Sequence, residues 1–395
     1  MTAASDTASD IVIVSARRTA MGGFQGDFRD VAASDLGAAA LKAAVADAKL
    51  GAADVEQVVM GCVLPAGQGQ APARQAALKA GLDLGTAAVT LNKMCGSGMK
   101  AVMDAHDALK AGSAGIIAAG GMESMTNAPY LLPRARSGYR MGHGRVMDHM
   151  FLDGLEDAYE PGRAMGTFAE ESARAYQLTR EAQDAYALES LACSQRAIAD
   201  GSFAAEITAV STKAGDILVD EQPGKARPEK IPNLKPAFAA DGTVTAANSS
   251  SISDGAAALV LMRRETADAR GLAPIATILG HSVHAQKPAL FTTAPVPAMQ
   301  KLMARLGWTV DGVDLFEVNE AFAVVSMIAM QELGLPHAKV NVNGGATALG
   351  HPIGASGARI LVTLIHALQK RGGGTGIASL CIGGGEATAV ALKVD

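Results

Sequence analysis

The chain contains an internal repeat, and this repeat restricts its fold more than any other feature. In residues 89–123, V-T-L-N-K-M-C-G-S-G precedes a predicted helix and then I-I-A-A-G-G-M-E. In residues 340–386, V-N-V-N-G-G precedes another helix and then I-A-S-L-C-I-G-G-G-E. Solenoid repeats have shorter periods of about 20–50 residues. The spacing therefore predicts two related halves packed together.

Strand-like and helix-like segments alternate along the first half. Apolar runs at 11–14, 54–60, 89–92 and 115–119 are separated by helical patterns at 36–48, 73–80 and 98–110. This alternation predicts an α/β fold with parallel sheets buried on both faces. We expect an N-terminal half over residues 1–272, carrying a loop-rich insertion at about 124–247, and a C-terminal half over residues 273–395.

Charge and cysteine content exclude several classes of protein. The net charge is −5, so no basic surface for a nucleic acid is expected. No run of about 18 apolar residues indicates a membrane span, and residues 1–10 resemble neither a secretory signal nor a transit peptide. Four cysteines in 395 residues do not form a disulfide framework. We expect a reduced, cytoplasmic protein in which an important cysteine acts as a thiol.

Cys95 is the first candidate for chemistry, because it follows a strand and directly precedes a helix. The N-terminus of a helix presents unpaired N–H groups and partial positive charge. We expect this environment to lower the pKa of the thiol and make it a nucleophile. The alternative is a buried structural cysteine, which is our interpretation of Cys62 and Cys193.

Three further residues of the second half have settings that suit chemistry. Cys381 is followed by Gly383 and two more glycines, whose N–H groups could form an oxyanion hole. His351 lies in a loop of small residues where the two repeats differ in length, a setting that favours an acid–base role. Asn319 follows a strand at a helix start. It is either the N-cap of that helix or a group that holds a water or substrate oxygen.

Other patterns are absent or weak. The sequence has no Walker A motif, no G-x-G-x-x-G, and no metal-ligand spacing such as C-x₂-C, so no metal and no bound cofactor are expected. Among the other histidines, His106 is expected on a helix and His281 in a loop, and neither setting suggests catalysis.

Taken in order, the motifs resemble those of the thiolase family, within it the acetyl-CoA acetyltransferases. They are N-K-M-C-G-S-G-M-K-A, G-G-M-E-S-M-T, G-T-V-T-A-A-N-S-S-S-I-S-D-G-A-A-A, E-V-N-E-A-F, N-V-N-G-G-A-T-A-L-G-H-P-I-G-A-S-G-A-R and C-I-G-G-G-E. The resemblance covers nearly the whole chain. It implies two α/β halves in a five-layer α-β-α-β-α core, an inserted loop domain that helps to bind coenzyme A, and a homotetramer built as a dimer of dimers.

The resemblance also implies ping-pong acyl transfer between coenzyme A thioesters. His351 would activate Cys95, whose thiolate takes the acyl group. Cys381 would then remove a proton from a second acetyl-CoA, and the carbanion would attack the acyl group to give acetoacetyl-CoA and CoA. N–H groups of Cys95 and Gly383 would hold one oxyanion, while His351 and a water fixed by Asn319 would hold the enolate oxygen.

By the same resemblance, Ser250, Ala246 and Phe238 would line the pantetheine channel, and Met165 and Phe322 would line the acyl pocket. Candidates for the CoA phosphates are Lys225, Arg227 and Lys230. Ala164, Ser251 and the segment 291–295 depart from the pattern of many short-chain members, so a degradative 3-ketoacyl-CoA thiolase of broader chain length is an alternative. A ketoacyl-synthase-type condensing enzyme would lack Cys381, a cysteine hydrolase would not need it, and a catalytically silent acyl-CoA-binding protein would not need all four residues.

Overall fold

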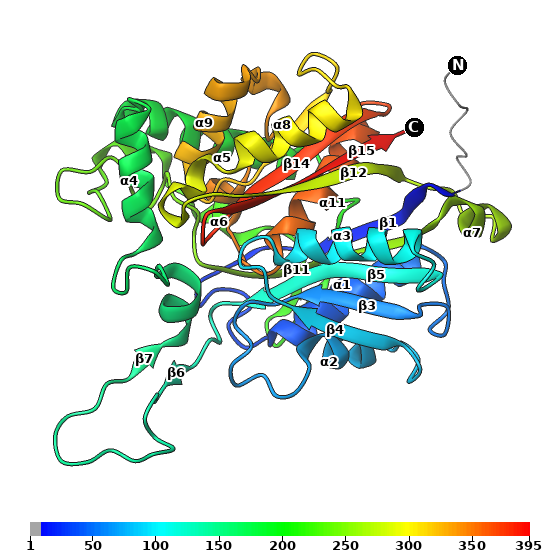
Figure 1. Ribbon diagram of the computed structural model, residues 1–395, viewed down its shortest axis with the longest axis horizontal. Coiled ribbons are helices and arrows are strands. Elements are labelled where there is room, and N and C mark those ends of the chain that lie inside the picture. The colour runs from blue at the N-terminus through cyan, green and yellow to red at the C-terminus, as the bar shows by residue number, and fades with distance from the viewer. Residues whose placement is uncertain (1–8) are drawn as a thin grey trace.

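The computed structural model describes residues 9–395, which form one large mixed sheet with helices on its faces (Figure 1). The sheet has eleven strands in the order β13-β14-β15-β12-β1-β11-β5-β3-β4, with β2 paired to β11 and β8 paired to β1. The strands of its main path are β1 Ile11–Thr19, β3 Gln57–Gly61, β4 Ala87–Leu91, β5 Ile116–Ser124, β11 Ser253–Arg263, β12 Ala276–Ala285, β13 Leu315–Val318, β14 Gly374–Ile382 and β15 Glu386–Val394. The two side strands are β2 Gly22–Gly23 and β8 Ile207–Thr208.

The sheet consists of two halves, one from each half of the chain, which pair in its middle. Antiparallel pairing of β1 with β12 joins them, with Ile11 opposite Ile278. On one side lie β11, β5, β3 and β4, and on the other lie β15, β14 and β13. A single parallel bridge from Phe316 to Val340 stands where the second half would need a counterpart of β4. The predicted duplication of an α/β unit is confirmed.

The predicted all-parallel pairing is wrong. Only β3 with β4, β3 with β5, and β13 with β14 are parallel along the main path. These are the strands that a helix or a long crossover separates in the chain. β14 and β15 are antiparallel because a short glycine turn joins them, and β5 pairs antiparallel with β11, which returns after the long insertion.

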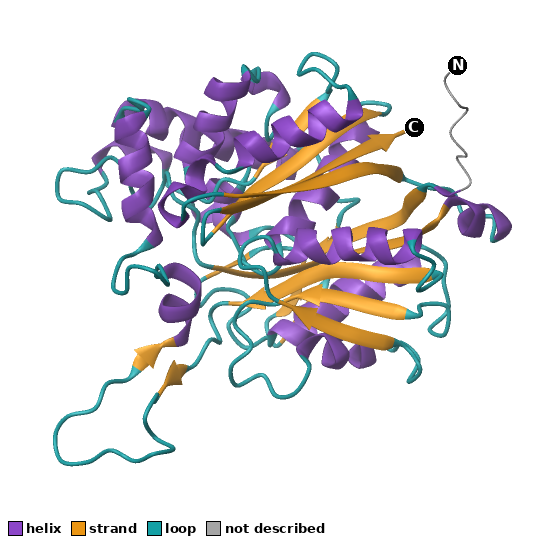
Figure 2. Cartoon of the chain, in the orientation of Figure 1, coloured by secondary structure: helices purple, strands orange, loops and turns teal. Residues whose placement is uncertain are grey.

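Three layers of helices alternate with the two halves of the sheet, which gives five layers in all (Figure 2). The middle layer consists of α3 (Ser97–Lys110) and α11 (Ser356–Lys370), which share one apolar core with strands from both halves. One outer layer contains α1 (Ala33–Asp47) and α2 (Pro72–Lys79), and the opposite one contains α8 (Pro295–Leu306) and α9 (Ala323–Leu333). The short α7 (Arg264–Ala269) and α10 (Ala346–Leu349), with 3₁₀ turns at Pro288–Thr293 and His337–Lys339, complete the two halves.

Glycine lets the two middle helices approach closely at their N-termini. A Cβ on Gly98 would lie 2.8 Å from the Ala358 nitrogen, and one on Gly357 would lie 2.4 Å from the Met99 nitrogen. Both distances are far below ordinary contact, so only glycine fits at either position. The start of α3 is thereby held against the start of α11.

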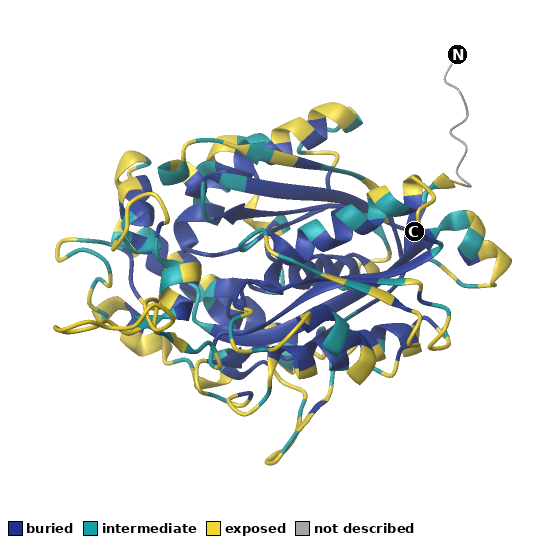
Figure 3. Ribbon diagram, turned by 60° about the horizontal axis from the view of Figure 1, so that its bottom comes forward, coloured by how far each residue is buried: buried dark blue, intermediate teal, exposed yellow. Residues whose placement is uncertain are grey.

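The segment between β5 and β11 forms the inserted loop domain. Its elements are β6 Tyr130–Leu131, β7 Met147–Asp148, a π-helical turn at Phe151–Leu155, α4 Met165–Ala175, α5 Arg180–Ala199, β8, β9 Val210–Thr212, β10 Gly215–Ile217, α6 Glu221–Lys225 and a 3₁₀ turn at Pro228–Asn233. The connection between β6 and β7 projects from the body and is exposed, whereas the central strands are buried (Figures 1 and 3). No helix within residues 9–395 is long and apolar enough to span a membrane.

Candidate active site

Cys95 lies in a tight turn between β4 and α3. Met94 adopts φ +47°, a left-handed conformation that non-glycine residues rarely occupy. The turn is fixed by the Ser97 hydroxyl, which accepts from the Lys93 N–H at 2.8 Å and donates to the Met94 carbonyl at 2.7 Å. A strained turn from strand to helix presents the side chain of its central residue outward, which is the geometry used by nucleophiles in other enzymes.

The backbone N–H of Gly383, in the other half of the molecule, faces the Cys95 thiol and favours its thiolate form. Burial nevertheless raises the pKa of Cys95 to about 11, because desolvation outweighs the N–H groups of Gly383 and Cys95 that favour the thiolate. The predicted lowering of this pKa by the helix N-terminus is therefore wrong for the resting protein. Cys95 holds its proton until a base removes it.

Cys381 is the next-to-last residue of β14, is buried, and lies close enough to Cys95 for the charges of the two sulfurs to interact. Burial raises the pKa of its thiol well above the ordinary value, and the negative charge of a Cys95 thiolate would raise it further. The turn after it holds the Gly383 N–H in place, with Gly385 at φ +86°. A Cβ on Gly385 would lie 2.4 Å from the Gln286 carbonyl oxygen, so this position also requires glycine.

His351 follows α10 and is 6% exposed. Its Nδ1 lies 2.6 Å from the Ser356 hydroxyl, and its backbone N–H donates to the Ser251 carbonyl at 3.2 Å. The Ser356 hydroxyl donates to the Pro352 carbonyl at 2.9 Å. Because its single proton is used there, the Ser356 oxygen accepts from Nδ1–H of His351. Nε2 then carries the free lone pair.

Nε2 of His351 is buried and has no hydrogen-bond partner within residues 9–395. Burial, with a smaller contribution from the positive charge of Arg359, lowers the pKa of His351 to about 3. The imidazole is therefore neutral at pH 7 and can accept a proton at Nε2.

Asn319 directly follows β13 and is 1% exposed. The N-cap interpretation is wrong, because α9 begins at Ala323 and its N-cap is Phe322. Neither the oxygen nor the nitrogen of the Asn319 amide has a partner in the described part of the chain. Since buried amides are normally hydrogen-bonded, this side chain fits a position that awaits a water or a substrate oxygen.

Four of the five residues predicted to line the substrate channel lie where the loop domain meets the second half, and the fifth, Ala246, is exposed. Phe238 and Phe322 make an edge-to-face contact with ring centroids 6.0 Å apart. Met165 starts α4, and its methyl group would lie 3.5 Å from a Cβ on Gly383. Ser250 donates its N–H to the carbonyl of Ala321, next to Phe322, and Ala246 is exposed. A surface pocket of about 640 Å³ opens beside Phe238.

Comparison with known proteins decides the family. The thiolase N-terminal domain model matches residues 11–265, and the thiolase C-terminal domain model matches residues 272–394. This chain belongs to the thiolase family.

Similar proteins include acetyl-CoA acetyltransferases from Escherichia coli and Pseudomonas aeruginosa. The first is 50% identical over 97% of this chain and 98% of its own length, and the second is 48% identical over 98% and 100%. A crystal structure of a thiolase from Ascaris suum in complex with coenzyme A superposes with a TM-score of 0.94 at 41% identity, covering 98% of this chain and 100% of that one. The five-layer thiolase fold expected from the motifs is confirmed.

Two positioning groups of this thiolase escaped the sequence prediction. One is Ser356, which contacts His351 and whose only indication in the sequence was its place five residues after that histidine. The other is Glu123, a fully buried carboxylate that accepts from the N–H groups of Val63, Leu64 and Gly354. Glu123 thus connects the end of β3 to the loop that carries His351, and its signal was its place in G-G-M-E-S.

The remaining cysteines and one of the candidate phosphate ligands have polar partners of their own. Cys62 is buried against Glu123 and Cys193 lies on α5 near Glu189. Lys225 pairs with Glu221, which also accepts from two backbone N–H groups at 23 and 27. Lys225 therefore already has a partner for its charge, while roles for Arg227 and Lys230 in binding phosphates stay predictions.

Proposed function

We propose that this thiolase is an acetyl-CoA C-acetyltransferase, which condenses two molecules of acetyl-CoA to acetoacetyl-CoA and CoA and catalyses the reverse thiolysis. The observation that carries the proposal is the pair of adjacent thiols, Cys95 and Cys381, with the Gly383 N–H directed at the first. Acyl transfer through one thiol needs no second one, whereas a Claisen condensation needs a base at the α-carbon. The curated names of relatives at 45–50% identity over nearly the whole chain support the same activity.

In the first half-reaction, Nε2 of His351 takes the proton of Cys95 as its sulfur attacks the thioester carbonyl. This coupling is required because Cys95 is protonated at rest, with a pKa of about 11. The N–H groups of Gly383 and Cys95, which face the sulfur in the resting protein, are placed to receive the oxyanion that develops beside it. Collapse of the tetrahedral adduct breaks the bond to the CoA sulfur and leaves an acetyl group on Cys95.

In the second half-reaction, Cys381 is the base. The CoA thiolate leaves with the Cys381 proton, and the positive charge on His351 favours the resulting Cys381 thiolate. That thiolate removes a proton from the methyl group of a second acetyl-CoA. His351 and a water on the Asn319 amide hold the enolate oxygen while the carbanion attacks the acetyl group. Cys95 leaves as a thiolate and recovers its proton from His351, so protons balance over the cycle.

The residues that select the substrate lie on the side of the site that faces the loop domain. Ser250, Ala246 and Phe238 line the path of the pantetheine arm, and Met165 and Phe322 close the acyl end. No metal or bound cofactor takes part in these steps. A homotetrameric assembly and a cytoplasmic location also stay predictions.

Mass spectrometry after mixing with acetyl-CoA tests the proposal. The Cys95→Ser variant should carry no acetyl group on residue 381 or on any other cysteine. The Cys381→Ala variant should be acetylated at Cys95 yet make no acetoacetyl-CoA. Cys193→Ala, which removes a cysteine on α5, is the matched control and should behave as the unaltered enzyme.

Two results would contradict the assignment: a cysteine-linked acetyl group in the Cys95→Ser variant, or full acetoacetyl-CoA synthesis by the Cys381→Ala variant. Thiolysis of 3-ketoacyl-CoA substrates of increasing chain length then separates the two thiolase types. A rate that falls sharply beyond four carbons supports the acetyl-specific enzyme, and a rate maintained for long chains supports the degradative one.

A further inference from the structure

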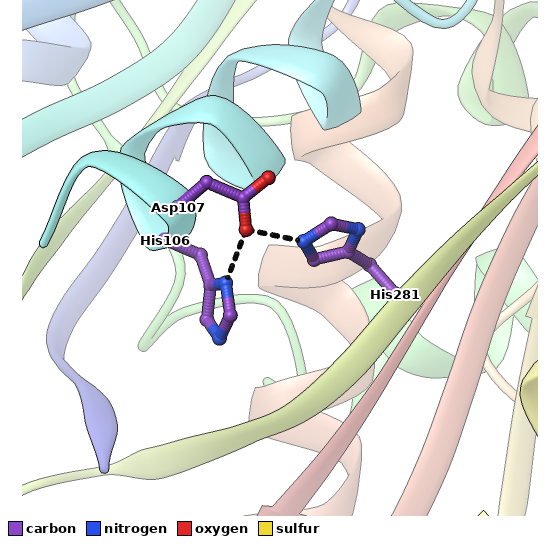
Figure 4. Close-up of side chains that lie close together, drawn as sticks. All are labelled: His106, Asp107 and His281. Carbon is purple, nitrogen blue, oxygen red and sulfur yellow. Dashed lines mark hydrogen bonds and ion pairs between the residues drawn. The ribbon is translucent and has the colours of Figure 1, made fainter. Parts of the chain in front are cut away.

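Two histidines and an aspartate that the proposed reaction does not use converge where α3 meets β12. His106 and Asp107 lie near the C-terminal end of α3, and His281 lies on β12 rather than in the predicted loop (Figure 4). Nδ1 of His106 and Nε2 of His281 each lie 2.9 Å from the same oxygen, Oδ1 of Asp107. The two imidazoles meet edge to face, with ring centroids 5.1 Å apart.

We propose that His106, Asp107 and His281 form a binding site for a divalent transition-metal cation of the Zn²⁺ class. Their three ligand atoms all lie within 4.8 Å of one another. A tetrahedral Zn²⁺ with bonds of about 2.1 Å sets its ligand atoms roughly 3.4 Å apart, so side-chain movements of about 1 Å suffice. Imidazole nitrogen and carboxylate oxygen are ligands that Zn²⁺ accepts, and imidazole also suits Cu²⁺ and Ni²⁺.

Exposure differs across the three ligands in a way that suits an open metal site. The two histidine side chains are 13% and 18% exposed, whereas the Asp107 side chain is 57% exposed. The imidazoles are therefore held by their surroundings, and the solvent side remains free for a water as the fourth ligand.

The ligands come from two different parts of the fold. His106 and Asp107 belong to the helix that starts beside Cys95, and His281 belongs to the second half of the sheet. At 1.5 Å per residue, His106 lies about 16 Å along α3 from Cys95. A bound ion would therefore join the far end of the nucleophile helix to β12 without touching the reacting groups. The positive charge of Lys110 acts on His106 and should weaken the binding of a cation there.

Equilibrium dialysis against Zn²⁺ tests the site, with the enzyme first alkylated by iodoacetamide so that Cys95 cannot bind the metal. We expect one equivalent bound by the unaltered chain, and at least about 100-fold weaker binding for His281→Ala and for His106→Ala, since loss of a direct ligand exceeds the 10- to 100-fold typical of outer groups. His284→Ala is the matched control, because His284 lies on the same strand and contacts Gln286 and Lys301 instead. This variant should bind as the unaltered chain does.

A second measurement needs no variant. Zn²⁺ should protect His281, but not His284, from modification by diethyl pyrocarbonate, as mapped by mass spectrometry of peptides. Binding that is unchanged in both histidine variants, or equal modification of His281 with and without Zn²⁺, would overturn the proposal. Neither outcome bears on the acyl-transfer reaction, because all three residues lie outside the site of Cys95 and Cys381.

Discussion

Replacing Ser356 with alanine tests how the structure sets the protonation of His351, the proposed base of this thiolase. The Ser356 oxygen accepts from Nδ1–H of His351 at 2.6 Å, because its own proton is donated to the Pro352 carbonyl at 2.9 Å. This arrangement fixes the tautomer in which Nε2 is unprotonated. In Ser356→Ala the buried Nδ1–H has no acceptor, and a proton on Nε2 becomes competitive.

The size of the effect follows from the burial of both groups. Ser356 is fully buried and His351 is 6% exposed, so solvent cannot replace the lost acceptor without rearrangement. Leaving a buried donor unsatisfied costs about 1–3 kcal/mol. At about 1.4 kcal/mol per tenfold in rate, acylation of Cys95 should slow roughly 5- to 150-fold. Binding of acetyl-CoA should change little, since Ser356 acts through His351.

Rapid-quench measurement of Cys95 acetylation at saturating acetyl-CoA is the suitable assay. Ser356→Thr keeps the hydroxyl and should recover part of the lost rate. Ser282→Ala removes another buried hydroxyl, one that donates to the Ala298 carbonyl at 2.7 Å, and controls for a general loss of stability. If Ser356→Ala acetylated Cys95 at the unaltered rate, Ser356 would not set the tautomer of His351.

Three further predictions concern neighbouring groups. The pKa of His351 is about 3 in the folded protein and about 6.5 in the unfolded chain, so below pH 6.5 the unfolded chain binds a proton that the folded protein does not. The free energy of unfolding should therefore fall as the pH drops below 6.5, by up to about 1.4 kcal/mol per pH unit. Denaturant melts of His351→Asn should show a shallower fall. Asn319→Ala should reduce condensation about 100-fold while Cys95 still acetylates, in a comparison of burst and steady-state rates. Gly385→Ala should lower stability by about 1–3 kcal/mol in denaturant melts, because φ +86° and the 2.4 Å approach to Gln286 exclude a Cβ without strain. Unchanged melts for His351→Asn or Gly385→Ala, or unimpaired condensation by Asn319→Ala, would each contradict the corresponding argument.

Local sequence predicted those parts of the site that depend on neighbouring residues in the chain. Cys95 between a strand and a helix and Cys381 before three glycines are local patterns, and the structure places both where these patterns indicate. The same holds for the helix predicted at 98–110 and for the helix predicted within residues 340–386, which form the two middle helices. Two of the predictions that were wrong, the pKa of Cys95 and the direction of the strands, depended on distant parts of the molecule. The pKa of Cys95 is set by burial between two halves, and strand direction depends on how distant segments pair.

Asn319 shows why a local pattern can also mislead. Asparagine after a strand and before a helix is a common N-cap. Here three residues lie between Asn319 and the first residue of α9, because Ser249 pairs with Phe322 and extends the chain before the helix begins. Ser356 was missed for the opposite reason. Its contact with His351 closes a turn whose shape depends on Gly354 being held by Glu123, more than two hundred residues earlier.

The duplication accounts for how these distant groups come together. Each half supplies one middle helix, and the glycines at 98 and 357 let the two N-termini meet almost backbone to backbone. Cys95 precedes one of these helices and His351 precedes the other, so the contact that joins the halves brings the proposed nucleophile and the proposed base to the same helix junction. In the second half, the counterpart of β4 is reduced to a single bridge at Val340. The chain that follows Val340 leaves the sheet and forms α10 and the loop with His351. This is the segment in which the two repeats differ in length. The segment that carries His351, in which the two halves differ, thus begins where the second half has a single bridge in place of β4.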